Sequence, residues 1–566
     1  MSHSSRGFSL IDVIVGIALT LVLFLSLFGL LRASVVLSTF AKGSAGATAL
    51  AETEMEYLRG LSYDKVGTVG GIPPGAVPQM ATTTENGITY VTDVFISYVD
   101  DPADGTGTND TDGITTDYKR ARVAVSYTVS GKTHSVVLVS NFVPPGIETS
   151  TGGGTLTLHV VNANGADVPG ATVRIVNAST SPAVDLSTLS DANGLVTLGG
   201  AATSTQYQAF VSMNGYSSAE TYAQTAVNAN PAPGYLTVAK DQTTTQTFAI
   251  DLLAHLNVIT DAPIATSAFT DSFADASKIA ALASTTVSGG AITLMSGQTS
   301  GSARSVATSS PHLVSWGMLV ATTTVPANTS ERLHVYDGNG VLVPDTVLPG
   351  NSIGFATFPV SLAGISTTTY PSLAVGATLG GDGSATPAVD AWSLSYTEGP
   401  FPIPNVAFTL TGAKTIGSRS DGTPIPKAVV NTSTGSDGVR SLALEWDSYE
   451  PSVPDYDVED ACPAPPYALA PGASENVSLF LVAKTADNLR VLVTDSTGAV
   501  VPGASVTLAR SGYTKTVKSS SCGSAYFGGL SAANDYTVTI AKSGYTTTTV
   551  SNVSVSGAST TGASFP

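Results

Sequence analysis

The sequence predicts a multidomain, mainly β protein. It starts with one long α-helix and a small antiparallel sheet, an α+β unit, and continues as β-sandwich modules and a jelly-roll-like domain. A chain of 566 residues exceeds what a single hydrophobic core holds. Its apolar residues form one N-terminal run and many short alternating stretches between Gly, Asn and Pro turns, which is typical of a long helix followed by strands.

Charge and cysteine content narrow the function classes. Only 12% of the residues are charged and the net charge is −18, so no basic patch can neutralise phosphates, which argues against nucleic acid as a partner. An acidic balance is compatible with divalent cations. Two cysteines are too few for a disulfide-rich scaffold but enough for one bridge.

The N-terminal apolar run extends from Phe8 to Leu31 and is long enough to cross a membrane. It is longer than the apolar region of a secretory signal peptide, and no small-residue cleavage site follows it cleanly. Arg6 on one side and Arg32 on the other do not orient it by the positive-inside rule. Asp12 costs about 2.5–3.5 kcal/mol inside a membrane, so a carboxylate there usually has a function and a partner.

The stretch "RGFSLID" resembles the processing site of type IV prepilins. The resemblance implies a leader over residues 1–7 and cleavage by a prepilin peptidase between Gly7 and Phe8, whose new amino group is methylated. Asp12 is then mature residue five, where the family usually has Glu, and pairs with the N-terminus of a neighbouring pilin subunit. Asp is one methylene shorter, which reduces its reach. A plain membrane anchor with an accidental acid is the alternative.

Residues 8–148 are expected to form one unit. Helical spacing continues over residues 45–61, and Gly43 and Gly46 are expected to loosen the helix. Strands are predicted at 87–99, 120–130 and 134–143, with a hairpin turn at Ser130–Lys132. A long helix followed by a small antiparallel sheet is the pilin layout, so this unit resembles a minor pilin or pseudopilin.

An acidic loop separates the first two predicted strands. Calcium takes six to eight oxygen ligands, which a flexible Asp-rich loop can supply, although the spacing is not that of an EF-hand. The spacing favours a solvated acidic loop, with a calcium site as the alternative, and calcium is the one cofactor that the sequence suggests. The candidate ligands are Asp100, Asp101, Asp104, Asp110, Asp112 and Asp117.

Beyond a predicted linker at 141–154, the sequence repeats itself. Residues 156–175 match residues 489–508, including Val-Pro-Gly-Ala in both copies, and Tyr207 aligns with Tyr536. These copies resemble the carboxypeptidase-regulatory-like, or transthyretin-like, β-sandwich, which implies spacer or binding modules without catalysis. We assign them to residues 149–255 and 487–566.

A degraded third copy is expected at 401–486, with Pro426–Ala428 as its strand entry. It carries an insertion that is expected to be a solvated loop, with a second cation site as the alternative. The acidic residues of this insertion are Asp455, Asp457, Glu459 and Asp460. Cys462 lies in the insertion and Cys522 in the last copy, so an exported chain is expected to bridge the two modules. Two free thiols or a metal pair are the alternatives.

The block 256–400 is expected to be a jelly-roll-like sandwich, because strands recur at regular spacing. Its end, with Asp390 and Trp392, resembles the closing strand of concanavalin-like and laminin-G-like domains, several of which bind sugars. Trp316 and Trp392 are therefore candidate sugar contacts, although alternating strands more often place Trp in the core, which is the favoured interpretation.

No catalytic motif appears among the six histidines or the serines, so the chain is not expected to be an enzyme. The sequence favours a minor type IV pilin at the tip of a filament or protruding from it, which primes assembly or adheres to a surface glycan or protein receptor. Such a protein lies in the cytoplasmic membrane before assembly and in an extracellular pilus or at the cell surface afterwards. A secretion-type pseudopilin that contacts cargo and a membrane-anchored surface lectin or hydrolase are the alternatives.

Overall fold

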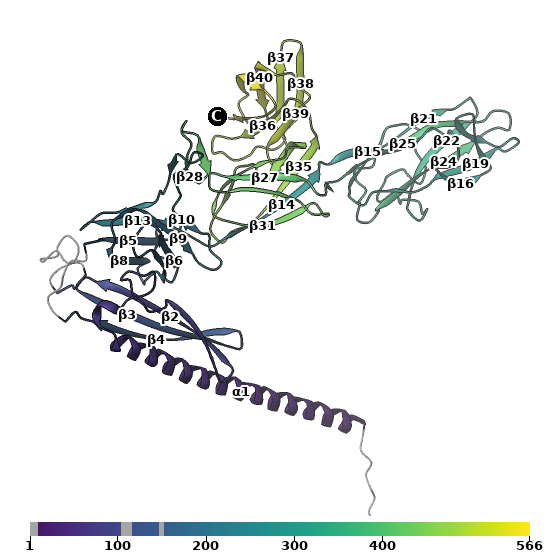
Figure 1. Ribbon diagram of the computed structural model, residues 1–566. Helices are drawn as coiled ribbons and strands as arrows, with labels where there is room; N and C mark the ends of the chain where they lie inside the picture. Colours follow the sequence, from purple (N-terminus) through teal and green to yellow (C-terminus); the bar gives the residue numbers. More distant parts are fainter. Residues whose placement is uncertain (1–9, 104–115, 146–151) are drawn as a thin grey trace, which may run out of the picture.

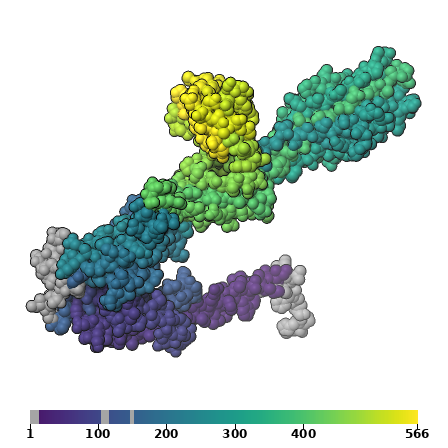
Figure 2. All heavy atoms as spheres, turned by 45° about the horizontal axis from the view of Figure 1, so that its top comes forward, coloured from purple at the N-terminus to yellow at the C-terminus, as the bar shows by residue number. Residues whose placement is uncertain are grey.

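The computed structural model describes residues 10–103, 116–145 and 152–566. One long helix precedes a series of sheets, most of them antiparallel, that pair into sandwich modules (Figure 1). The predicted fold class is therefore confirmed. The modules form an extended, bent chain, not a compact body, as the space-filling view also shows (Figure 2).

The helix–sheet unit, residues 10–142, consists of one helix on a four-stranded antiparallel sheet in the order β1-β2-β3-β4. The hairpin turn predicted at Ser130 is present: Ser130 and Gly131 have φ values of 51° and 78°, as a two-residue hairpin turn requires. The strand β1 was not predicted. The elements are α1 (Leu10–Gly60), η1 (Tyr63–Lys65), β1 (Met80–Glu85), β2 (Ile88–Val99), β3 (Tyr118–Val129) and β4 (Lys132–Phe142).

Two glycines fix how closely the helix approaches this sheet. The expectation that Gly43 and Gly46 loosen the helix is wrong, because α1 is continuous to Gly60. A Cβ atom at Gly43 would overlap the buried ring of Tyr127, and one at Gly46 would overlap the hydroxyl of Tyr90. The glycines therefore provide space for two tyrosine rings.

Replacing Gly46 by Ala tests this packing. The added methyl group must displace the buried Tyr90 ring, and such overpacking costs about 1–3 kcal/mol, more than the ~1 kcal/mol that Ala gains in helix propensity. We expect Gly46→Ala to lower the melting temperature of the helix–sheet unit. Gly60→Ala is the matched control, since nothing lies within 4 Å of its Cβ position; equal melting temperatures for the two variants would contradict this account.

The first module, residues 154–251, packs two sheets around one core. Its first strand, β5, lies between β13, which is parallel to it, and β8, which is antiparallel. The last module, residues 488–564, repeats this pattern with β36 between β42 and β39.

The strands of the first module are β5 (Gly154–Val161), β6 (Thr172–Asn177), β7 (Val184–Leu189), β8 (Leu195–Ala201), β9 (Ser204–Ser212), β10 (Ala219–Glu220), β11 (Asn230–Pro231), β12 (Leu236–Val238) and β13 (Thr243–Ala249). Those of the last module are β36 (Asn488–Thr494), β37 (Ser505–Arg510), β38 (Tyr513–Lys518), β39 (Ser524–Gly528), β40 (Ala533–Ala541), β41 (Thr548–Val555) and β42 (Ala558–Ser564).

The middle module is assembled from two separate segments. Strand β14 lies between the parallel β35 and the antiparallel β31, as β5 and β36 lie between their neighbours. The predicted boundary at 256 is therefore wrong for this strand, because 254–262 belongs to the core and sheet of residues 401–483. Residues 265–398 form an inserted module between the two segments of this sandwich.

The strands of the middle module are β14 (Ala254–Ala262), β26 (Phe401–Pro402), β27 (Ala407–Gly412), β28 (Thr415–Ser418), β29 (Pro424–Pro426), β30 (Val429–Ser433), β31 (Val439–Leu444), β32 (Asp447–Ser452), β33 (Tyr456–Cys462), β34 (Tyr467–Leu469) and β35 (Ser474–Ala483). The acidic insertion expected to be a loop is thus partly the strand β33.

A buried hydroxyl fixes the second strand in the first, middle and last modules. Ser190 Oγ donates to the carbonyl of Val168 and accepts from the N–H of Ala171. Ser519 makes the equivalent pair of contacts in the last module. In the middle module Thr434 accepts from the N–H of Val406.

This contact corrects the alignment of the third copy. Thr434 marks residues 403–406 as the counterpart of the Val-Pro-Gly-Ala entry, and Asn405 has a positive φ of 57°, as Gly170 of the first copy has a positive φ of 76°. Pro426–Ala428, predicted as the strand entry, instead belongs to the hairpin of β28 and β29.

The inserted module is a two-sheet sandwich that extends away from the other modules (Figures 1 and 2). Its core includes Trp316 and Trp392, each 1% exposed. Trp316 Nε1 donates to the carbonyl of Tyr370, and Trp392 contacts the ring of Phe273 edge-on at 4.9 Å. Neither ring can stack on a sugar, so the two candidate sugar contacts are wrong, and the favoured position of both rings in the core is confirmed.

The strands of the inserted module are β15 (Ala265–Asp271), β16 (Ile279–Ala283), β17 (Thr285–Ser288), β18 (Ala291–Leu294), β19 (Ser300–Ser305), β20 (Thr308–Ser309), β21 (Leu313–Thr324), β22 (Ser330–Asp337), β23 (Val360–Ser361), β24 (Ser372–Gly380) and β25 (Ala388–Glu398).

Candidate functional site

The helix α1 has two halves with opposite surroundings. Apolar side chains between Ile14 and Leu37 are exposed, among them Phe28 at 72%. Further along, Ala47, Ala51 and Leu58 are fully buried against the sheet. The first half is long and apolar enough to cross a membrane, with a mean hydropathy of 2.2 in its best window.

The predicted processing residues precede this helix in the sequence. Gly7 and Phe8 lie outside the described residues. Asp12 lies in the first turn of α1, and its side chain is outside the described part of the structure. Cleavage and pairing at these positions therefore stay predictions.

The predicted calcium loop is described only at its ends. Asp104, Asp110 and Asp112 lie outside the described residues. Asp117 Oδ2 accepts from the N–H of Asp101, so this carboxylate closes the base of the loop next to Asp100. In the part of the chain that is described, no group of three or more His, Cys, Asp or Glu is placed to hold a metal, which also covers Asp455, Asp457, Glu459 and Asp460. Calcium binding stays a prediction.

A buried lysine stands beside this loop and was missed in the sequence. Lys119 on β3 is 2% exposed, and its Nζ donates to the carbonyls of Tyr63 and Val66 at 2.8 Å each. Burial lowers the pKa of Lys119 to about 8, while Asp64 acts in the opposite direction. An ammonium group thus holds the turn after α1 against the sheet.

The lowered pKa predicts a pH dependence of stability. Between pH about 8 and 10.4 the unfolded lysine holds more protons than the folded one, so the free energy of unfolding rises with pH through this range. We expect Lys119→Met to remove that rise. Urea unfolding from pH 8 to 10 measures it, with the fluorescence of a Tyr57→Trp substitution as the signal of unfolding of the helix–sheet unit. The exposed Lys65→Met should keep it; a slope unchanged by Lys119→Met would refute the assignment.

The helix–sheet unit is docked on the first module, not only tethered to it. Ile72, from the segment between η1 and β1, belongs to the core of the first module and is 3% exposed. Gln79 donates to the carbonyl of Asp185 and accepts from the N–H of Ser187, and the N–H of Asp185 donates to Gly70. These contacts cover the free edge of β7, so the two units pack side by side despite the linker predicted at 141–154.

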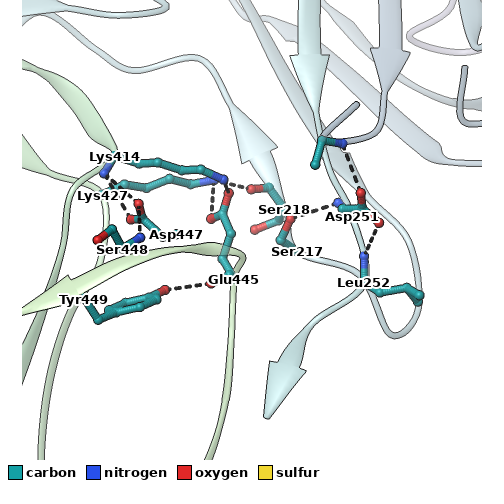
Figure 3. Close-up of polar contacts among 11 residues, drawn as sticks. Ser217, Ser218, Asp251, Leu252, Lys414, Lys427, Glu445, Asp447, Ser448 and Tyr449 are labelled. Atoms are coloured by element: carbon teal, nitrogen blue, oxygen red, sulfur yellow. Dashed lines mark hydrogen bonds and ion pairs between the residues drawn. The ribbon is translucent and has the colours of Figure 1, made fainter. Parts of the chain in front are cut away.

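An ion triad of the middle module lies at its junction with the first module (Figure 3). Glu445 lies between Lys414 and Lys427, with N–O distances of 2.8 and 2.7 Å, and its side chain is only 13% exposed. Lys427 also donates across the junction to the carbonyl of Ser218. Strands β11 and β28 pair beside the triad and add backbone contacts between the modules.

Neutralising Glu445 should weaken this junction. The two partly buried ammonium groups would then lie together without their shared carboxylate. Removing one partner of a fully buried ion pair costs several kcal/mol of stability, and water reduces this cost to about 1–2 kcal/mol here. We expect Glu445→Gln to make the link at Asp251–Leu253 about tenfold more sensitive to limited proteolysis. Asp241→Asn removes the exposed Lys240–Asp241 pair and is the control without effect; equal cleavage of both variants would contradict the role of Glu445.

A disulfide between Cys462 and Cys522 joins the middle and last modules. It closes a loop of 60 residues, which adds about 4 kcal/mol in the chain-entropy model. The carboxylate of Asp457 is buried at the same junction, where it accepts from Thr485 and from the hydroxyl of Tyr526. This acidic side chain therefore holds the two modules together.

Comparison with known proteins supports one module strongly. Residues 488–566 match the family model of the carboxypeptidase regulatory-like domain, which confirms the resemblance for the last module. No curated protein matches the chain.

Solved structures overlap with the chain only loosely. They include the Bacillus anthracis TIE protein, at 11% identity, 87% of this chain, 74% of that chain and a TM-score of 0.16. BcpA, the major pilin subunit of Bacillus cereus, overlaps at 11% identity, 73% and 99% coverage and a TM-score of 0.13. The shaft pilin SpaA from Lactobacillus rhamnosus GG overlaps at 14% identity, 30% and 90% coverage and a TM-score of 0.12. These scores do not establish a shared overall architecture.

Proposed function

We propose that the chain is a minor type IV pilin that enters a filament through α1 and carries its modules outside the filament. The observation that supports this most is the division of α1, whose first half is exposed and apolar while its second half is buried on a four-stranded antiparallel sheet. A helix that is apolar on all sides needs a membrane or other helices around it. In an assembling pilin, the first half of α1 is surrounded first by the membrane and then by the helices of neighbouring subunits.

The N-terminal residues supply the chemistry of assembly in this proposal. A prepilin peptidase cuts between Gly7 and Phe8, and the new amino group is methylated. The carboxylate of Asp12 pairs with that amino group on a neighbouring subunit. A buried pair of this kind fixes the register of two chains more than it adds net stability.

The size of the modules argues for few copies per filament. The modules after residue 154 extend well beyond the helix–sheet unit (Figures 1 and 2). A tight helical lattice cannot hold that bulk at every position, so the protein lies at the tip or protrudes from the shaft. From there the modules can reach a surface glycan or protein receptor without any catalytic role.

N-terminal mass analysis of the mature protein tests the proposal directly. We expect a methylated Phe8 as the first residue and co-purification with filaments. Asp12→Ala should abolish incorporation, because the neighbouring amino group loses its partner in an apolar medium, while Asp12→Glu should keep it and Ser9→Ala is the control. Mature protein that retains Met1 and stays in the membrane would overturn the proposal in favour of a permanent anchor.

A further inference from the structure

An open groove of about 730 Å³ lies where α1 leaves the sheet. One wall is a face of the helix and the other is the hairpin of β3 and β4. Phe40 and His134 close one end, with ring centroids 5.0 Å apart in an edge-on contact. The lining residues are Gly29, Arg32, Ala33, Val36, Leu37, Phe40, Val129, Ser130, Lys132 and His134.

The groove carries positive charge in a strongly acidic chain. Arg32 and Lys132 face it from the two walls, and none of its lining residues is acidic, although the net charge of the chain is −18. Both side chains are exposed, and neither forms an ion pair within the described residues. The rest of the lining is mostly apolar or small, so the groove combines two basic groups with an apolar floor.

The position of the groove along α1 places it at a membrane surface. From Ile14 to Leu31 the helix rises roughly 27 Å, close to the ~30 Å of a bilayer's hydrocarbon core. Arg32 follows directly, on the side of the modules. The positive-inside rule places basic residues on the cytoplasmic side of a membrane, whereas Arg32 and Lys132 lie on the side of the modules. We therefore expect them to have a specific negatively charged partner there.

We propose that this groove binds an anionic phospholipid of the outer leaflet. The phosphate group lies between Arg32 and Lys132, and the upper part of an acyl chain runs along Gly29 and Ala33, where small side chains leave room. The bound lipid would hold the β3–β4 hairpin on the membrane surface and set the depth of α1 before assembly. This inference rests on one part of the proposed function, that α1 crosses a membrane.

Native mass spectrometry of the full chain in detergent tests the site with defined lipids. We expect phosphatidylglycerol to be retained about 25-fold more than phosphatidylcholine, since each of the two basic residues near an anionic headgroup contributes roughly fivefold. The double variant Arg32→Gln with Lys132→Gln should bind both lipids equally. Lys240→Gln, an exposed lysine of the first module, is the matched control and should keep the preference.

Three outcomes would overturn the inference. The first is that the wild-type protein retains both lipids equally. The second is that the double variant keeps the preference for phosphatidylglycerol while its melting temperature is unchanged. The third is that inorganic phosphate or a second copy of the chain occupies the groove in place of lipid. The N-terminal mass from the same spectra separates the two proposals. Methylated Phe8 without lipid preference refutes only the lipid site, whereas lipid preference with Met1 retained refutes only the pilin.

Discussion

The structure depends on one constraint: the first half of α1 cannot remain in water. Its exposed apolar side chains follow one another around the whole helix, so no single protein face can cover them. The second half meets the sheet closely only because Gly43 and Gly46 admit two tyrosine rings. The change from one surrounding to the other therefore occurs within a few turns, at the groove between Arg32 and Lys132.

The modules that follow are joined by three physically different junctions. The helix–sheet unit meets the first module through the buried Ile72 and through Gln79 at a sheet edge. The first and middle modules meet beside the partly buried Glu445, and the disulfide of Cys462 joins the middle and last modules. Each junction covers groups that a free module would expose, such as the edge of β7. The helix–sheet unit and the first, middle and last modules are thus held in an extended series by direct contacts, not by flexible linkers alone.

Local patterns predicted what depends on local sequence. The helix, the turn at Ser130 and the repeat between the first and last modules follow from periodicity, turn residues and direct similarity. Pairing over long distances was not accessible: β14 pairs with β35 although 219 residues separate Asn257 from its partner Asn476. For the same reason neither Glu445 nor Lys132 was predicted, because Glu445 meets Lys427, and Lys132 comes to line the same groove as Arg32, only in the fold. Burial of Trp316 follows from which face of its strand meets the core, which alternation alone cannot decide.

The location of the inserted module explains how one chain can combine a fixed scaffold with a separate exposed domain. The insertion follows β14, and β14 is held on both sides by β31 and β35 and by the hydroxyl of Thr260, which donates to Ile403. Every pairing that defines the sandwich therefore forms without residues 265–398, and loop-closure entropy grows only slowly with the length of an insertion. The surface of such a domain can change without changing α1 or the junctions. The inserted module is thus the part of the chain on which the pairings of the middle module depend least.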